Sequence, residues 1–155
     1  MDLRMDLERK TRRTMIRAVT MCAGQPKTTI LLIARSQHRA GVIFGDEVLN
    51  FIKAFPGLQK SVRYERGAIK FYNGSVIRFI GCGSAEETRH FTGYNADAVI
   101  VEEGYFGNFQ SHEGKRILEE MLFRLRCPCG KHFGFFYQDG TPVCTTKDFF
   151  EPKDG

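Results

Sequence analysis

The sequence lacks the features that mark membrane, secreted and disulfide-stabilised proteins. None of its apolar runs approaches the roughly 18 residues that a membrane-spanning helix needs, so no span is expected. The N-terminus is charged and has no apolar core of the secretory kind, so no secretory signal is expected. The cysteines are odd in number and unevenly spaced, which argues against a disulfide scaffold and favours a reducing cytoplasm. They are Cys22, Cys82, Cys127, Cys129 and Cys144.

The composition is that of one ordinary globular domain. The 155 residues suffice for a single hydrophobic core, and the hydrophobic content of 42% and charged content of 26% are typical. Tryptophan is absent. The net charge of +5 is compatible with a polyanionic partner and does not by itself demonstrate one.

A buried strand that ends in two acids is the most informative stretch. Residues 98–101 are apolar and rich in β-branched side chains, and Glu102 and Glu103 follow directly. In a nucleotide-hydrolysing α/β core, such a strand delivers acids to the carboxyl edge of the sheet. Glu102 could then hold Mg²⁺, and Glu103 could orient or deprotonate the attacking water. The alternative is an edge strand that ends in two solvated acids.

The rest of the chain alternates helical and strand patterns. A helix is predicted from about Met15, ended by Gly24 and Pro26, before a continuous apolar strand over 28–34. Apolar residues between Val42 and Phe55 recur at helical spacing and are expected in the core, with Pro56-Gly57 ending that helix. An Asn-Gly pair between strands 68–72 and 75–80 predicts a hairpin, to which residues 62–64 could add a strand. A packing helix is predicted over 113–126.

The block Gly93–Phe106 resembles the Walker B region of viral DNA-packaging terminase large subunits. In that family a glycine, an aromatic residue and an Ala-Asp pair lead into a hydrophobic strand that ends in Asp-Glu. This chain departs from the pattern by having Glu102 in place of the aspartate. The order of elements over about residues 10–126 is also similar to that family.

The resemblance implies an α/β fold: a P-loop NTPase-like core with a mainly parallel sheet, a β-hairpin insert and flanking helices. Residues 1–126 would form part of the terminase-like ATPase core. Residues 127–155 would form a cysteine-containing β tail, either separate or the end of the same domain. Strands 28–34 and 98–102 should be central and buried.

The phosphate loop of such enzymes has the pattern G-x-x-x-x-G-K-S/T just before a helix. The resemblance places it at residues 7–14, where Thr14 fits the residue that touches Mg²⁺ and Arg13 could replace the lysine. Neither glycine is present, so the close approach of backbone N–H groups to phosphate is not supplied. The loop therefore lay upstream, has decayed, or the resemblance misleads. The basic run over residues 1–17 is either a solvated helix face or a phosphate-contacting arm.

The resemblance also implies a function. The chain would bind ATP and Mg²⁺ and drive double-stranded DNA into a viral capsid, in the host cytoplasm, within a homo-oligomeric ring that meets the portal and the small terminase subunit. Glu103 would be the catalytic acid, Glu102 and Thr14 would touch the metal, and Arg13 and Thr14 would touch the nucleotide. The chain is too short to carry a nuclease domain as well. The alternative is a non-catalytic nucleic-acid-binding or assembly module that keeps the fold but lacks a working phosphate loop.

The C-terminal cysteines allow one further hypothesis. A Cys₃His set could hold a structural zinc ion, although the C-x-C spacing is less usual than C-x-x-C and buried thiols are the competing interpretation. The four candidate ligands are Cys127, Cys129, His132 and Cys144.

Overall fold

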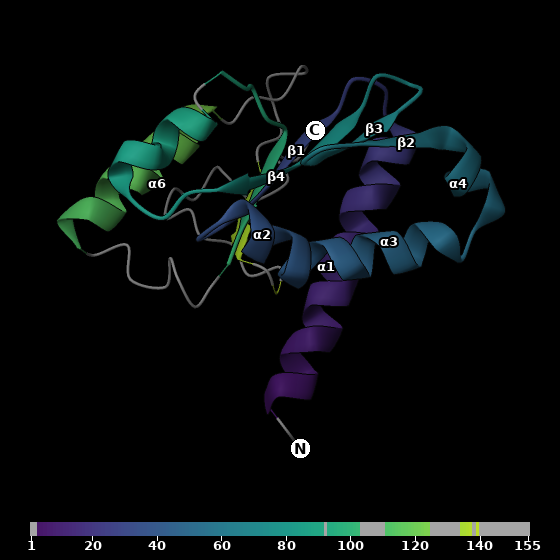
Figure 1. The fold of residues 1–155 in the computed structure, drawn as a ribbon, viewed down its shortest axis with the longest axis horizontal. Helices are drawn as coiled ribbons and strands as arrows, with labels where there is room; N and C mark the ends of the chain where they lie inside the picture. The colour runs from purple at the N-terminus through teal and green to yellow at the C-terminus, as the bar shows by residue number, and fades with distance from the viewer. Residues whose placement is uncertain (1–2, 92, 103–110, 125–133, 138, 140–155) are drawn as a thin grey trace, which may run out of the picture.

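A six-stranded sheet with helices around it forms the fold (Figure 1). The computed structural model describes residues 3–91, 93–102, 111–124, 134–137 and 139. The strand order is β2-β3-β4-β1-β5-β6. The strands are β2 (Val62–Glu65), β3 (Ala68–Phe71), β4 (Val76–Gly81), β1 (Thr29–Ala34), β5 (Ala98–Val101) and β6 (Gly134–Tyr137).

Strand β1 lies at the centre, parallel to β4 on one side and to β5 on the other. All of β5 and five of the six residues of β1 are buried. Continuous apolar runs of this kind are expected where both faces of a parallel sheet are covered. The structure confirms the prediction that strands 28–34 and 98–102 are central and buried. It also confirms the prediction of an α/β fold with a mainly parallel sheet. Strand β6 pairs in parallel with β5 and belongs to the same sheet.

Alternation along the strands assigns side chains to two faces. Ile30 and Leu32 point to the face that we call the α1 face, where they join a core with residues of the first long helices. Leu31 and Ile33 point to the opposite face, which we call the α6 face, and are also fully buried. The main members of the α1-face core are Met15, Val19, Cys22, Ile30, Leu32, Phe44, Val48, Ile52, Ile77 and Ile100.

Helix α1 (Leu3–Gly24) begins well before the predicted start at about Met15. The buried positions Thr11, Met15 and Val19 continue one helix face at a spacing of four. Thr11 is tolerated on this buried face because its hydroxyl donates to the Leu7 carbonyl oxygen at 2.9 Å. Because the polar Thr11 interrupts the apolar pattern, the start of the helix was predicted too late.

The segment after β1 is helical throughout 37–53 and again after a short break. It consists of α2 (Gln37–Ala40), a π-helical turn (Gly41–Gly45), α3 (Asp46–Lys53) and α4 (Pro56–Ser61). Pro56 ends α3 as predicted, but it also begins α4, because proline fits the first helical turn. Val42 and Phe55 are about half exposed, so their prediction as core residues was wrong. Val48 and Ile52 of the same set are fully buried.

The predicted hairpin is confirmed and carries a third strand, β2. Gly74 has a φ of 91°. The turn requires this backbone conformation, and glycine adopts it more easily than residues that carry a side chain. The Asn73 side-chain amide donates to the Cys22 carbonyl oxygen at 2.8 Å, and its oxygen accepts from the Ser75 N–H at 2.9 Å. The turn is thereby fixed to the end of α1.

The connections that follow β1 and β5 leave the centre of the sheet in opposite directions. The chain passes from β1 through α2, α3 and α4 towards β4, and it passes from β5 through α6 (His112–Arg124) to β6. Because such crossovers are right-handed, their helices lie on opposite faces. In Figure 1, α6 accordingly lies apart from α1 and α3, beside the 3₁₀ turn η2 (Ala85–His90). Glu113 of α6 accepts from the Ala85 N–H at 2.9 Å.

Within the described part of the chain, no helix combines the length and apolar character needed to cross a membrane.

Candidate active site at the carboxyl ends of β1 and β5

The carboxyl ends of β1 and β5 are where a ligand is expected in this sheet, and we call this position the crevice. Ligands in open α/β sheets bind where neighbouring parallel strands send their connections to opposite faces, and β1 and β5 do so. Glu102 is the first residue after β5, and its N–H donates to the Ile33 carbonyl oxygen at 3.0 Å. This backbone bond extends the ladder by one residue and fixes the carboxylate at the crevice.

Glu102 is buried, with a side-chain exposure of 4%, and it forms an ion pair with Arg39. The Arg39 Nε group donates to the carboxylate atom Oε1, and Nη2 forms the ion pair with the same oxygen. The hydrogen bond and the charge of Glu102 raise the pKa of Arg39 above its usual value. A buried carboxylate needs such a partner, because an unpaired charge in the interior is costly.

Arg39 reaches the crevice because of how α2 begins. The Ser36 hydroxyl accepts from the Arg39 N–H at 3.1 Å, which caps the helix directly after β1. The guanidinium itself is about half exposed, so one end of the ion pair lies in solvent and the other lies in the protein.

The second oxygen of Glu102 is suited to a metal ion. Oε2 is buried and has no hydrogen-bond partner among the described residues. Mg²⁺ prefers hard oxygen ligands, and it often takes only one or two carboxylates and fills its other positions with water and phosphate oxygens. The donor chemistry at Oε2 therefore fits Mg²⁺, with the Arg39 charge close by as a competitor for the same carboxylate.

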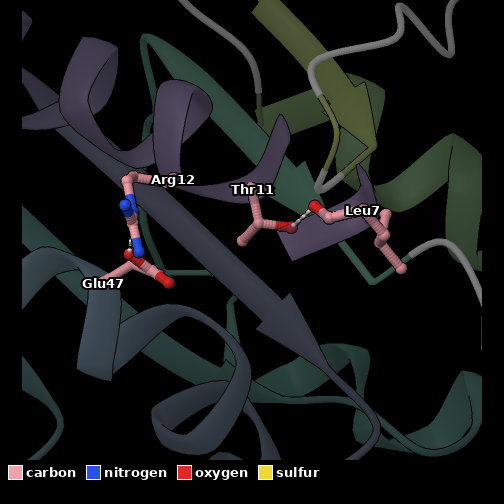
Figure 2. A network of polar contacts seen from close by, with 4 residues as sticks. All are labelled: Leu7, Thr11, Arg12 and Glu47. Atoms are coloured by element: carbon pink, nitrogen blue, oxygen red, sulfur yellow. Dashed lines mark hydrogen bonds and ion pairs between the residues drawn. The ribbon is translucent and has the colours of Figure 1, made fainter. Parts of the chain in front are cut away.

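The segment assigned to a phosphate loop, residues 7–14, lies within α1 (Figure 2). Figure 2 shows the Thr11 hydroxyl turned to the Leu7 carbonyl and Arg12 reaching across to Glu47 of α3, at 3.1 Å. The Thr14 hydroxyl donates to the Lys10 carbonyl oxygen at 2.9 Å. Since backbone N–H groups inside a helix bond to carbonyls of the preceding turn, this segment offers no cradle for phosphate.

Arg13 and Thr14 do line a cavity of about 230 Å³ between α1 and the sheet. Its floor includes Ala98 and Ile100, which share the α1 face with Glu102 because the three alternate along the strand. Three of the predicted site residues therefore lie on one side of the sheet. The roles of Arg13 and Thr14 stay predictions.

Glu103 and the zinc candidates Cys127, Cys129, His132 and Cys144 lie outside the described residues. Among the residues that are described, no group of three or more His, Cys, Asp or Glu side chains is placed to hold a metal ion. The assignments of Glu103 and of the zinc set therefore stay predictions.

The position of Arg39 beside Glu102 was not predicted from the sequence. One signal was present: Ser36 follows a buried strand as a plausible N-cap, and Arg39 stands three residues later in the first turn. A cation there lies at the same edge of the sheet as any acid that follows β5. The pairing itself spans 63 residues of sequence and needs the strand order to be known.

The mixed sheet with a parallel centre and flanking helices is consistent with an α/β P-loop-like fold. Comparison with solved structures gives a matching neighbour, the large terminase ATPase domain of Thermus phage P74-26. The similarity has a TM-score of 0.52 at 17% identity, and for a point mutant of that domain 0.51 at 18%. It covers 90% of this chain but only 57–58% of those chains. The chain thus has a terminase ATPase-like fold, as predicted. No family model and no curated protein matches its sequence.

Proposed function

We propose that the chain is part of an ATP-driven DNA-packaging motor of the large terminase kind, which couples Mg-ATP hydrolysis to movement of double-stranded DNA into a viral capsid. One observation carries the proposal. A buried carboxylate with a free oxygen, Glu102 Oε2, lies in the central crevice of a sheet that has the terminase ATPase-like fold. The basic net charge of +5 is compatible with a DNA substrate.

The proposed roles follow from the positions of the acids. Glu102 would hold Mg²⁺ through Oε2, and the metal would neutralise charge that develops on the phosphate oxygens. Arg39 keeps the other oxygen of Glu102 in place. Glu103, the next residue, would orient the attacking water and accept its proton. Arg13 and Thr14 would contact the nucleotide from the α1 side.

A second candidate is a non-catalytic nucleic-acid-binding or assembly module. Two observations favour it: residues 7–14 are helical, and Arg39 already neutralises the carboxylate that would hold the metal. In that case the crevice is a structural remnant, and the ion pair has replaced the metal.

The partners follow from the motor proposal. They are double-stranded DNA, the portal, the small terminase subunit and further copies of this chain in a ring, in the host cytoplasm. A zinc ion on Cys127, Cys129, His132 and Cys144 is a separate proposal. Stoichiometric zinc in the purified protein would support it, and its absence would end it.

Titration calorimetry with Mg-ATP on the parent chain and on Glu103→Gln tests the motor proposal. We expect both to bind and only the parent to hydrolyse, because Glu103 acts in the chemical step. Absence of binding up to millimolar ATP would overturn the proposal and favour the non-catalytic module. Glu120→Gln on α6 is a matched control that should behave as the parent.

A further inference from the structure

A second cavity, of about 430 Å³, opens at the carboxyl ends of β1 and β4. It lies one strand away from the crevice that holds Glu102, between the β2–β3 turn and the 3₁₀ turn η2. We call it the arginine pocket. Its lining includes Arg35, Arg66, Arg78, Glu87, His90 and Tyr94.

The arginine pocket has an excess of positive charge. Among the described lining residues there are three arginines and one glutamate, which gives these residues a net charge of +2 with neutral histidine. That carboxylate, Glu87, already accepts a hydrogen bond from the Gly83 N–H. The His90 Nδ1 lies 2.6 Å from the Gly81 carbonyl oxygen, so Nδ1 must carry the proton.

The Arg78 side chain has a buried N–H group that lacks a hydrogen-bond acceptor among the described residues. Its guanidinium lies over the Tyr94 ring, 4.4 Å from the centroid, which fixes the orientation of the group. Its Nε atom is buried and has no hydrogen-bond partner in the part of the chain that the structure describes. Buried N–H groups are almost always paired, so the unpaired Nε of a residue that lines a cavity calls for a physical explanation, and a bound water, an ion or a ligand is one.

The pocket continues into a basic surface on the α6 face of the hairpin. Register places Arg63 opposite Lys70 and Ala68 opposite Arg78, so the three basic side chains share one face. They line a further cavity of about 380 Å³. Glu65 is the acid among them, paired with Lys70 at 3.0 Å and Arg63 at 3.3 Å.

We propose that the arginine pocket binds a phosphate oxyanion. Guanidinium groups present forked N–H donors that match phosphate oxygens, and Arg35, Arg66 and Arg78 line the same cavity. The source is either a phosphodiester of a nucleic acid that runs along Arg63 and Lys70, or a free phosphate or mononucleotide. The inference assigns a site outside the proposed catalytic centre and does not depend on ATP hydrolysis at Glu102; the phosphodiester source rests on the proposed DNA substrate.

Titration of the ¹⁵N-labelled chain, without ATP or Mg²⁺, tests the proposal. The probes are inorganic phosphate, a mononucleotide, a short DNA duplex and a poly-glutamate peptide, and the readout is the Arg78 Nε–Hε signal. A shift with the duplex alone identifies a nucleic-acid backbone, and a shift with inorganic phosphate as well identifies a small phosphate ligand. No shift with any phosphate, or a stronger response to poly-glutamate, would overturn the proposal.

Substitutions separate the arginine pocket from general basic charge. We expect Arg66→Gln and Arg78→Gln to weaken binding about tenfold and, for the duplex, to lower the slope of log affinity against log salt by about 1. Arg116→Gln on α6 removes the same charge elsewhere and should change neither. Arg66 is exposed in a turn, so its variant should fold even if that of Arg78 does not. Equal binding by Arg66→Gln and the parent would contradict the assignment.

Discussion

Replacing Arg39 should destabilise the protein more than replacing its partner Glu102. Arg39→Met leaves the Glu102 carboxylate, 4% exposed, without a cation. Breaking a fully buried ion pair costs about 3–5 kcal/mol, and here the loss should be about 2–3 kcal/mol because Arg39 is half in solvent. Glu102→Gln leaves a guanidinium that water can solvate, so its cost should be only about 1 kcal/mol.

A double-mutant cycle in urea measures this asymmetry. The combined Arg39→Met and Glu102→Gln variant should be more stable than Arg39→Met alone, because no unpaired charge remains buried. The unfolding free energies of the parent, both single variants and the double variant give the coupling directly. If Arg39→Met costs no more than Glu102→Gln, the buried pair at the crevice is not as we describe it.

Three further predictions concern backbone packing at Gly81, the buried thiol of Cys22 and metal binding at Glu102. Gly81→Ala should lower the free energy of unfolding by about 1–3 kcal/mol, measured by heat or urea, because a Cβ there would lie 2.4 Å from the Gln37 backbone nitrogen. Gly41→Ala is the control, since a Cβ there would meet nothing within 4 Å, and it should be neutral or stabilising. Equal effects of the two substitutions would contradict this packing. Burial raises the pKa of Cys22 from 9.0 to about 12, so the folded state holds the thiol proton more tightly and stability is lost as pH rises through that interval. In urea unfolding, Cys22→Ala should lose less stability than the parent as the pH is raised through this interval. An equal loss of stability in the two proteins would refute the burial of the thiol as its cause. Arg39→Met should bind Mg²⁺ more tightly than the parent by calorimetry, because the competing cation is gone; weaker binding would count against Oε2 as a ligand.

The central strands and the hairpin were predictable because their signals are local. Continuous apolar runs predicted β1 and β5, and Asn73-Gly74 predicted the turn between β3 and β4. Each signal spans only a few residues and needs no knowledge of distant neighbours. The early start of α1 was missed because Thr11 is polar yet buried, with its hydroxyl satisfied inside the helix.

The site was predictable only in part. The position of Glu102 directly after a buried strand was predicted from the sequence, and its role as a metal ligand stays a prediction. Arg39 and the arginine pocket were not identified, because both depend on the order of strands in the sheet. Val42 and Phe55 show the same limit: helical spacing placed them on a face that the neighbouring elements leave half exposed.

The most direct test of the account asks where a divalent metal binds. Mn²⁺ with ATP, as a paramagnetic substitute for Mg²⁺, should broaden backbone amide signals around Ala34, Glu102 and Arg39, at the carboxyl ends of β1 and β5. The broadening should be lost in Glu102→Gln. Broadening centred elsewhere in the chain, or none at saturating ATP, would contradict a metal-dependent nucleotide site at this crevice.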